Sequence, residues 1–283
     1  MSRYRLSVLL AAAFARSAAV SSAGDLVGER IQAARERTAA LQDDAAADRA
    51  ARARSGGARA DGGIHSPEAG SDPFYGKELD VDGIKIRSSE RTSDAALEAA
   101  AQTVRKMTDR ADVLANLVAA KLDIAVIART EVTTDIPEYR HLKGTKTGDG
   151  RDWDADTRGI GGTRRIPTTS VGEENLLKLS PDPYRGEDIL THEFAHSVYL
   201  IGIAPSERRA VQAAYAAARE SKVWGEATYA ASNVEEYFAE ASQAFYDAGQ
   251  AANTKINNGV ATREALRRAD PGLEKILASI YTP

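Results

Sequence analysis

The segment Thr191-His192-Glu193-Phe194-Ala195-His196-Ser197-Val198-Tyr199 contains the pattern His-Glu-x-x-His. In an α-helix with 3.6 residues per turn, His192 and His196 lie one turn apart on the same face, roughly 5–6 Å from each other, which is close enough to bind one zinc ion. Glu193 can reach a water molecule held by that ion. The alternative is two surface histidines beside an unrelated glutamate. The spacing favours a metal-binding helix, which then needs a third ligand.

The third ligand cannot follow the familiar three-histidine pattern. Zincins of that kind continue with His-x-x-Gly-x-x-His, but Tyr199 occupies the glycine position here and Gly202 the histidine position. The chain has no cysteine, so thiolate ligands are excluded as well. We therefore expect a carboxylate from a second helix to complete the site.

The segment 232–240, Ser-Asn-Val-Glu-Glu-Tyr-Phe-Ala-Glu, supplies candidate carboxylates. Ser232 and Glu235 fit a capping box, which predicts that a helix begins here. Glu236 and Glu240 then share one face at a spacing of four residues, next to an apolar stripe that would hold this helix against the histidine helix. Two acids in that position need a partner for their charge, and a zinc ion with its histidines would be that partner.

Together these motifs resemble a known family. His-Glu-Phe-Ala-His, followed forty residues later by Asn-Val-Glu-Glu-Tyr-Phe-Ala-Glu, is similar to the catalytic core of the anthrax lethal factor group among the glutamate-type zincins, over residues 188–247. The resemblance implies that His192, His196 and Glu236 are zinc ligands and that Glu193 is the general base. It also implies that Tyr229 stabilises the transition state and that Glu240 supports one of the ligands.

The composition indicates a soluble globular protein, with 43% hydrophobic and 28% charged residues. The net charge of −4 gives no reason to expect nucleic acid as a partner of the whole chain. After the N-terminus, no stretch approaches the ~20 apolar residues that a membrane span requires. We expect a monomer without a membrane span whose partner is a protein or peptide substrate.

The N-terminus predicts a secretory signal peptide over residues 1–23, because a short basic stretch precedes the apolar run Leu6–Ala15 and small residues precede Gly24. A secreted protein is therefore expected. An organelle transit peptide is the alternative, since three arginines and no acid precede Asp25. Residues 24–72 are rich in Ala, Arg, Asp, Glu and Gly, and they read as a low-complexity linker or a pro-segment.

The pattern of residues 73–283 predicts one α+β domain. A hairpin around Asp82-Gly83, two helices and buried strands at Leu122–Ala128 and Glu174–Leu179 come first, and helices dominate after residue 190. The segment between Glu131 and Thr169 is expected to be loop-rich. Its glycine run, Gly159–Gly162, is interpreted as a turn into an edge strand bordering the cleft, where an extended peptide could add as a further strand. This order indicates a zincin-like metallopeptidase domain with a small mixed sheet over an active-site helix and a helical C-terminal part.

These expectations define a function. The sequence predicts a secreted zinc metalloendopeptidase that hydrolyses peptide bonds by a zinc-bound water, with Glu193 as general base and one Zn²⁺ per chain. Tyr229 would stabilise the developing oxyanion, and Glu240 would accept the free ring N–H of a histidine ligand. The alternatives are a zinc hydrolase acting on a different amide and a catalytically silent zinc domain that recognises a protein partner.

Overall fold

The computed structural model describes residues 63–148, 150–184, 187–250 and 254–282. These residues belong to one compact unit. The predicted signal peptide, 1–23, and nearly all of the predicted linker or pro-segment, 24–72, lie outside the described residues. Within the described part of that segment, the backbone of His65 pairs with Glu78 and extends the sheet by one bridge.

A five-stranded mixed sheet organises the first half of this unit, with strand order β1-β2-β3-β5-β4. Its strands are β1 (Lys77–Val81), β2 (Ile84–Ser88), β3 (Asp123–Ile127), β4 (Gly159–Ile160) and β5 (Thr168–Gly172). The inner pairs β2–β3 and β3–β5 are parallel, whereas β1–β2 and β4–β5 are antiparallel. Asp82 and Gly83 join β1 to β2 with φ angles of 52° and 92°, so the predicted two-residue hairpin is confirmed.

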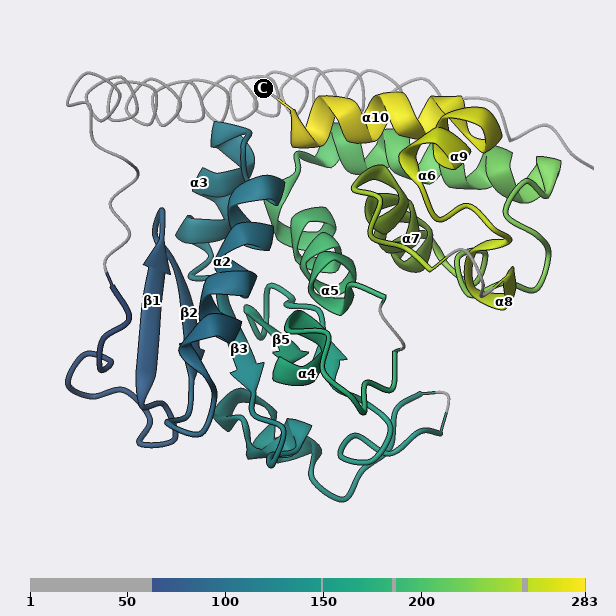
Figure 1. Ribbon diagram of the computed structural model, residues 1–283. Helices are drawn as coiled ribbons and strands as arrows, with labels where there is room; N and C mark the ends of the chain where they lie inside the picture. The colour runs from purple at the N-terminus through teal and green to yellow at the C-terminus, as the bar shows by residue number, and fades with distance from the viewer. Residues whose placement is uncertain (1–62, 149, 185–186, 251–253, 283) are drawn as a thin grey trace, which may run out of the picture. The chain divides into compact units, whose positions relative to one another are not determined.

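Both faces of the sheet are covered, because alternate side chains of β3 enter two separate hydrophobic clusters. Ile124 and Val126 belong to the main core, under α2 (Asp94–Met107), while Ala125 and Ile127 belong to a smaller cluster. That second cluster also contains Ile136, which follows the 3₁₀ segment η1 (Thr133–Asp135), and Tyr139 of the 3₁₀ segment η2 (Pro137–Leu142). Figure 1 shows α2 in front of β2 and β3, with α3 (Ala111–Ala119) above. Burial on both faces explains why β3 is an unbroken apolar run.

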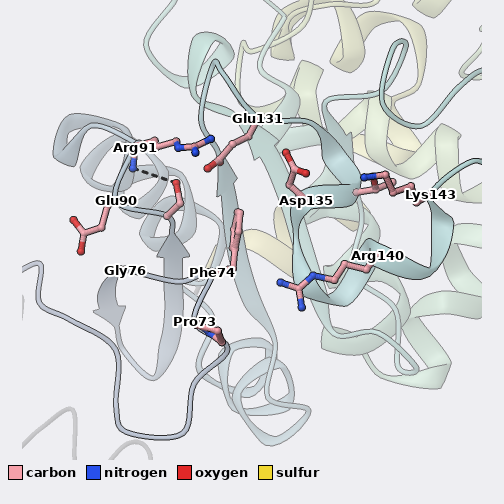
Figure 2. Close-up of a pocket in the computed structure, with 11 residues that line it drawn as sticks. Pro73, Phe74, Gly76, Glu90, Arg91, Glu131, Asp135, Arg140 and Lys143 are labelled. Atoms are coloured by element: carbon pink, nitrogen blue, oxygen red, sulfur yellow. Dashed lines mark hydrogen bonds between the residues drawn. The ribbon is translucent and has the colours of Figure 1, made fainter.

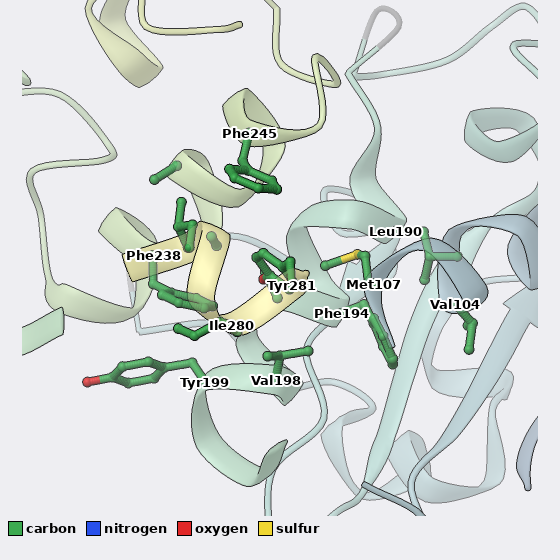
Figure 3. Close-up of a cluster of buried hydrophobic side chains, with 14 of the residues drawn as sticks. Val104, Met107, Leu190, Phe194, Val198, Tyr199, Phe238, Phe245, Ile280 and Tyr281 are labelled. Carbon is green, nitrogen blue, oxygen red and sulfur yellow. The ribbon is translucent and has the colours of Figure 1, made fainter. Parts of the chain in front are cut away.

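The histidine motif forms α5 (Ile189–Ser197), which continues as one π-helical turn, η3 (Val198–Gly202). One face of α5 enters the core, where Leu190 and Phe194 are fully buried. Figure 3 shows these side chains beside Val104 and Met107 of α2 and near Tyr281. α5 is thereby held between the sheet and the C-terminal helices. Its histidines lie on a different face of the helix from Leu190 and Phe194.

The C-terminal part is helical, as predicted. It consists of α6 (Pro205–Ser221), α7 (Val234–Phe245), α8 (Thr254–Asn257), α9 (Arg263–Ala269) and α10 (Pro271–Tyr281). α7 packs against α5, and α6, α9 and α10 pack on α7 in turn (Figure 1). The expected α+β class is confirmed, with a small sheet followed by helices.

One predicted strand is wrong. Residues 174–179 do not form a strand; Glu173–Leu176 form the short helix α4, and the strand β5 comes just before it, beginning at the end of the segment predicted to be loop-rich. β5 has the sequence Thr-Thr-Ser-Val-Gly, and all five residues are buried. Its polar hydroxyls obscured a central strand, which is recognisable only from its position between β3 and β4.

Among the described residues, no helix combines the length and the apolar character needed to cross a membrane.

Candidate metal centre

α5 presents both histidines of the motif on one face. The helix begins at Asp188, whose side chain accepts a hydrogen bond from the Thr191 N–H at 3.0 Å. His192 and His196 lie one turn apart, and their Nε2 atoms are 3.2 Å from each other. Both residues are buried, at 6% and 9% exposure. The predicted pairing of the two imidazoles is therefore present in the fold.

α7 brings Glu236 to the same point. Its carboxylate Oε2 lies 3.1 Å from His192 Nε2 and 3.4 Å from His196 Nε2. The predicted capping box of Ser232 and Glu235 is wrong, because Asn233 caps the helix: its side-chain oxygen accepts hydrogen bonds from the N–H groups of residues 235 and 236, both at 2.9 Å. This cap fixes the first turn of α7, on which Glu236 sits.

The three converging atoms have the dimensions of a zinc site. Metal–ligand bonds of about 2.0–2.1 Å at a tetrahedral ion place neighbouring ligand atoms about 3.3–3.4 Å apart. The triangle formed by the two imidazole nitrogens and the carboxylate oxygen has edges of 3.1, 3.2 and 3.4 Å. Among the described residues, His192, His196 and Glu236 form the only such group of possible metal ligands. Two imidazoles and one carboxylate also make up a donor set that zinc uses, so these residues fit that ion.

The carboxylates of the centre favour a positive charge between them. Burial acts to lower the pKa of His192, but Glu236 and Glu240 outweigh it and raise that pKa well above its usual range. Burial acts to raise the pKa of Glu236, but its contacts with the two histidines prevail and lower it. The carboxylates thus stabilise a cation at this position, either an imidazolium or a metal ion.

Glu193 lies beside the ligands, beneath the edge strand β4. Burial raises the pKa of its carboxyl group. An ideal Cβ on Gly159 would stand 3.1 Å from Glu193 Oε1 and 2.6 Å from Ile189 Cγ2, and one on Gly161 would stand 2.5 Å from the Cβ of His196. The glycine run therefore lets the backbone of β4 pass directly over α5. An edge strand is present as predicted, but it consists of the first residues of the run, Gly159–Ile160, rather than following it.

Tyr229 lies at the rim of the centre. Its ring stacks against that of His192, with centroids 6.1 Å apart and an interplanar angle of 24°, and 39% of the residue is exposed. The N–H of Tyr229 donates to the Lys255 carbonyl at 3.1 Å, which anchors this loop. Burial of its inner side, and then the Glu236 carboxylate, raise the pKa of the phenol, so the hydroxyl is protonated at neutral pH.

Behind His192 lie two further polar groups on α7. The expected partner, Glu240, has its Oε1 atom 3.4 Å from His192 Nδ1. Gln243, which is not among the expected site residues, is nearer: its Oε1 lies 3.1 Å from the same nitrogen. Its position seven residues after Glu236, on the same helix face, is the sequence signal that could have revealed it.

A further buried acid, Glu187, lies near this group. Burial, and next the negative charge of Glu240, raise the pKa of Glu187 to about 7. The residue is 6% exposed and directly precedes the helix cap Asp188.

A separate pocket of about 690 Å³ lies at the carboxyl end of β2 (Figure 2). It is bordered by Phe74 and by charged residues of both signs, among them Arg91, Glu131 and Lys143. None of its lining residues belongs to the metal centre.

Comparison with known protein families finds no match, and no curated protein matches the chain. Among solved structures, the fold is similar to that of the Pro-Pro endopeptidase PPEP-2 from Paenibacillus alvei. The two chains are 20% identical, the similarity covers 70% of this chain and 97% of the other, and the TM-score is 0.49. A likeness of this degree assigns neither an activity nor a substrate to this chain.

Proposed function

We propose that this chain is a zinc metallopeptidase of the glutamate-type zincin class. His192, His196 and Glu236 would hold one zinc ion. The observation that carries the proposal is the triangle of their ligand atoms, with edges of 3.1–3.4 Å, built from two helices that the core presses together. Glu193 next to the triangle and Tyr229 at its rim support a hydrolytic site rather than a purely structural one.

When bound, zinc supplies a Lewis acid that polarises a carbonyl and lowers the pKa of water to about 7. Glu193 takes a proton from the attacking water as the water oxygen bonds to the carbonyl carbon. The same carboxyl group then delivers the proton to the amine nitrogen as the C–N bond breaks. Gly159 leaves room for this carboxylate, because a side chain at that position would stand against it.

Tyr229 would donate a hydrogen bond from its hydroxyl to the oxyanion that forms during attack. A neutral phenol can do so, and the interaction strengthens as charge develops, which is the condition for lowering the barrier. Its stacking on His192 and its half-exposed position support this role.

The substrate would bind as an extended peptide along β4. This strand pairs with β5 on one side, and among the described residues no strand pairs with its other edge. Backbone N–H and C=O groups at such an edge can pair with a further strand. A peptide added there would cross α5 next to Glu193.

The test is a peptide-library cleavage assay on the zinc-loaded full chain, comparing wild type with Glu193→Gln. We expect wild type to cut peptides and Glu193→Gln to lose at least about 10²-fold in rate while retaining its zinc, because the amide keeps the shape but cannot accept the proton. Glu235→Gln, an exposed neighbour of Glu236, is the matched control and should keep wild-type activity. If the zinc-loaded wild type cuts no peptide, the peptidase proposal is rejected and the catalytically silent zinc-binding domain remains.

A further inference from the structure

Gln243 is a fully buried amide on α7 that contacts both the candidate metal ligand His192 and the start of α5. Its Nε2 donates to the Asp188 carbonyl at 2.9 Å, and its Oε1 lies 3.1 Å from His192 Nδ1. Asp188 is the cap of the histidine helix. One side chain therefore links the cap of α5 to the outer nitrogen of its first histidine.

These contacts determine the orientation of the amide and the tautomer of His192. A backbone carbonyl can only accept, so the Gln243 atom facing Asp188 must be the NH₂ group. The carbonyl oxygen of the amide then faces His192 Nδ1, which must carry a hydrogen to donate to it. With the hydrogen on Nδ1, the neutral imidazole directs the lone pair of Nε2 toward His196 and Glu236.

We propose that Gln243, rather than Glu240, is the positioning residue that orients His192 for metal binding. The inference rests on the proposed zinc site. Glu240 Oε1 is farther from Nδ1, at 3.4 Å, and Glu240 Oε2 is buried without a hydrogen-bond partner. Gln243, in contrast, uses both ends of its amide at hydrogen-bond distance.

A neutral amide suits this position. Glu193, Glu236 and Glu240 already bring three carboxylates to the two histidines. Gln243 fixes the ring without adding a fourth negative charge or competing for the Nδ1 proton. Loss of such an outer partner usually weakens metal affinity by about 10–100-fold.

The test is the zinc affinity of the full chain, measured by competition with a chelator, together with the visible absorption spectrum of the Co²⁺-loaded protein. Gln243→Met keeps the size of the side chain but removes the acceptor; we expect zinc affinity to fall about 10–100-fold and the Co²⁺ spectrum to change. Gln243→Glu restores an acceptor for Nδ1 while losing the donor to Asp188, and it should recover most of the affinity. Glu240→Gln removes a nearby negative charge but leaves the Gln243 acceptor in place, so it should weaken zinc binding less than Gln243→Met does.

Ser242→Ala is the matched control, because Ser242 is equally buried on α7 but bonds to Phe238 and Tyr281 instead of His192. It should leave zinc affinity unchanged. Unchanged affinity in Gln243→Met, or equal losses in Gln243→Met and Gln243→Glu, would overturn the inference. Gln243 would then only connect α7 to α5. A larger loss in Glu240→Gln than in Gln243→Met would return the role to Glu240. A wild type that binds no zinc would overturn the proposed function itself.

Discussion

Gly159 illustrates how much one missing side chain contributes to the site. An alanine there would place its Cβ 2.6 Å from Ile189 Cγ2, which is closer than atoms can pack, and 3.1 Å from Glu193 Oε1, which is a tight contact. We expect Gly159→Ala to displace Glu193 or lift β4, and to reduce kcat/KM by on the order of 10²-fold while zinc content stays at the wild-type level. Steady-state kinetics and metal analysis on the same preparation check this.

Gly148→Ala is the control for that substitution. A Cβ at Gly148 meets no atom within 4 Å, so activity should not change. If Gly159→Ala is as active as Gly148→Ala, the close passage of β4 over Glu193 does not matter for function.

At the residue scale, helical spacing predicted that His192 and His196 share one face of a helix and that Glu236 and Glu240 share a face of another. Spacing could not choose Glu236 as the ligand, a choice that rested on the family resemblance. It also could not predict the role of Gly159, which depends on a contact between segments far apart in sequence. The cap of α7 shows a finer limit. Ser232 and Asn233 are both good capping residues, and only the backbone angles decide that Asn233 takes the position.

At the element scale, the entry to β4 is fixed by a buried ion pair. Arg158 directly precedes β4 and binds Glu174 through two hydrogen bonds of 2.7 and 2.8 Å, with both side chains under 15% exposed. The Arg158 N–H also donates to the Tyr184 hydroxyl at 2.9 Å. These contacts hold β4 in the position in which it lies over α5.

Glu174→Ala should lower the free energy of unfolding by on the order of 3 kcal/mol, because it leaves the Arg158 guanidinium buried without its partner. Urea denaturation measures the change. Glu226→Ala, which breaks an exposed pair with Lys222, should cost less than about 0.5 kcal/mol. Equal effects of the two substitutions would show that the Arg158 pair does not hold this element.

Elements with a strong apolar period could be predicted from sequence: the hairpin, the helices α2 and α7 and the strand β3 were all expected and are all present. The centre of the sheet was harder to predict. β5 carries three hydroxyl residues, and the Thr169 hydroxyl bonds to that of Ser197 of α5 at 2.7 Å. A strand with three hydroxyl side chains among five residues gives no local apolar signal.

At the scale of the whole molecule, the site lies where separate parts of the chain meet. β4 comes from the sheet, α5 lies between the sheet and the C-terminal helices, and α7 belongs to those helices. The main hydrophobic core fixes the positions of these helices, because Phe194 of α5 and Phe238 of α7 are fully buried in the same cluster. A metal ion bound by α5 and α7 would therefore join two parts of the fold, and its binding would stabilise the folded state.

The zinc content of Glu236→Ala tests the central claim most directly. The measurement is the number of zinc ions per full chain, determined by elemental analysis after loading and desalting, for wild type, Glu236→Ala and the exposed control Glu235→Ala. We predict one zinc per chain in wild type and in Glu235→Ala, and loss of zinc in Glu236→Ala. One zinc per chain in Glu236→Ala would contradict the assignment of Glu236 as the third ligand.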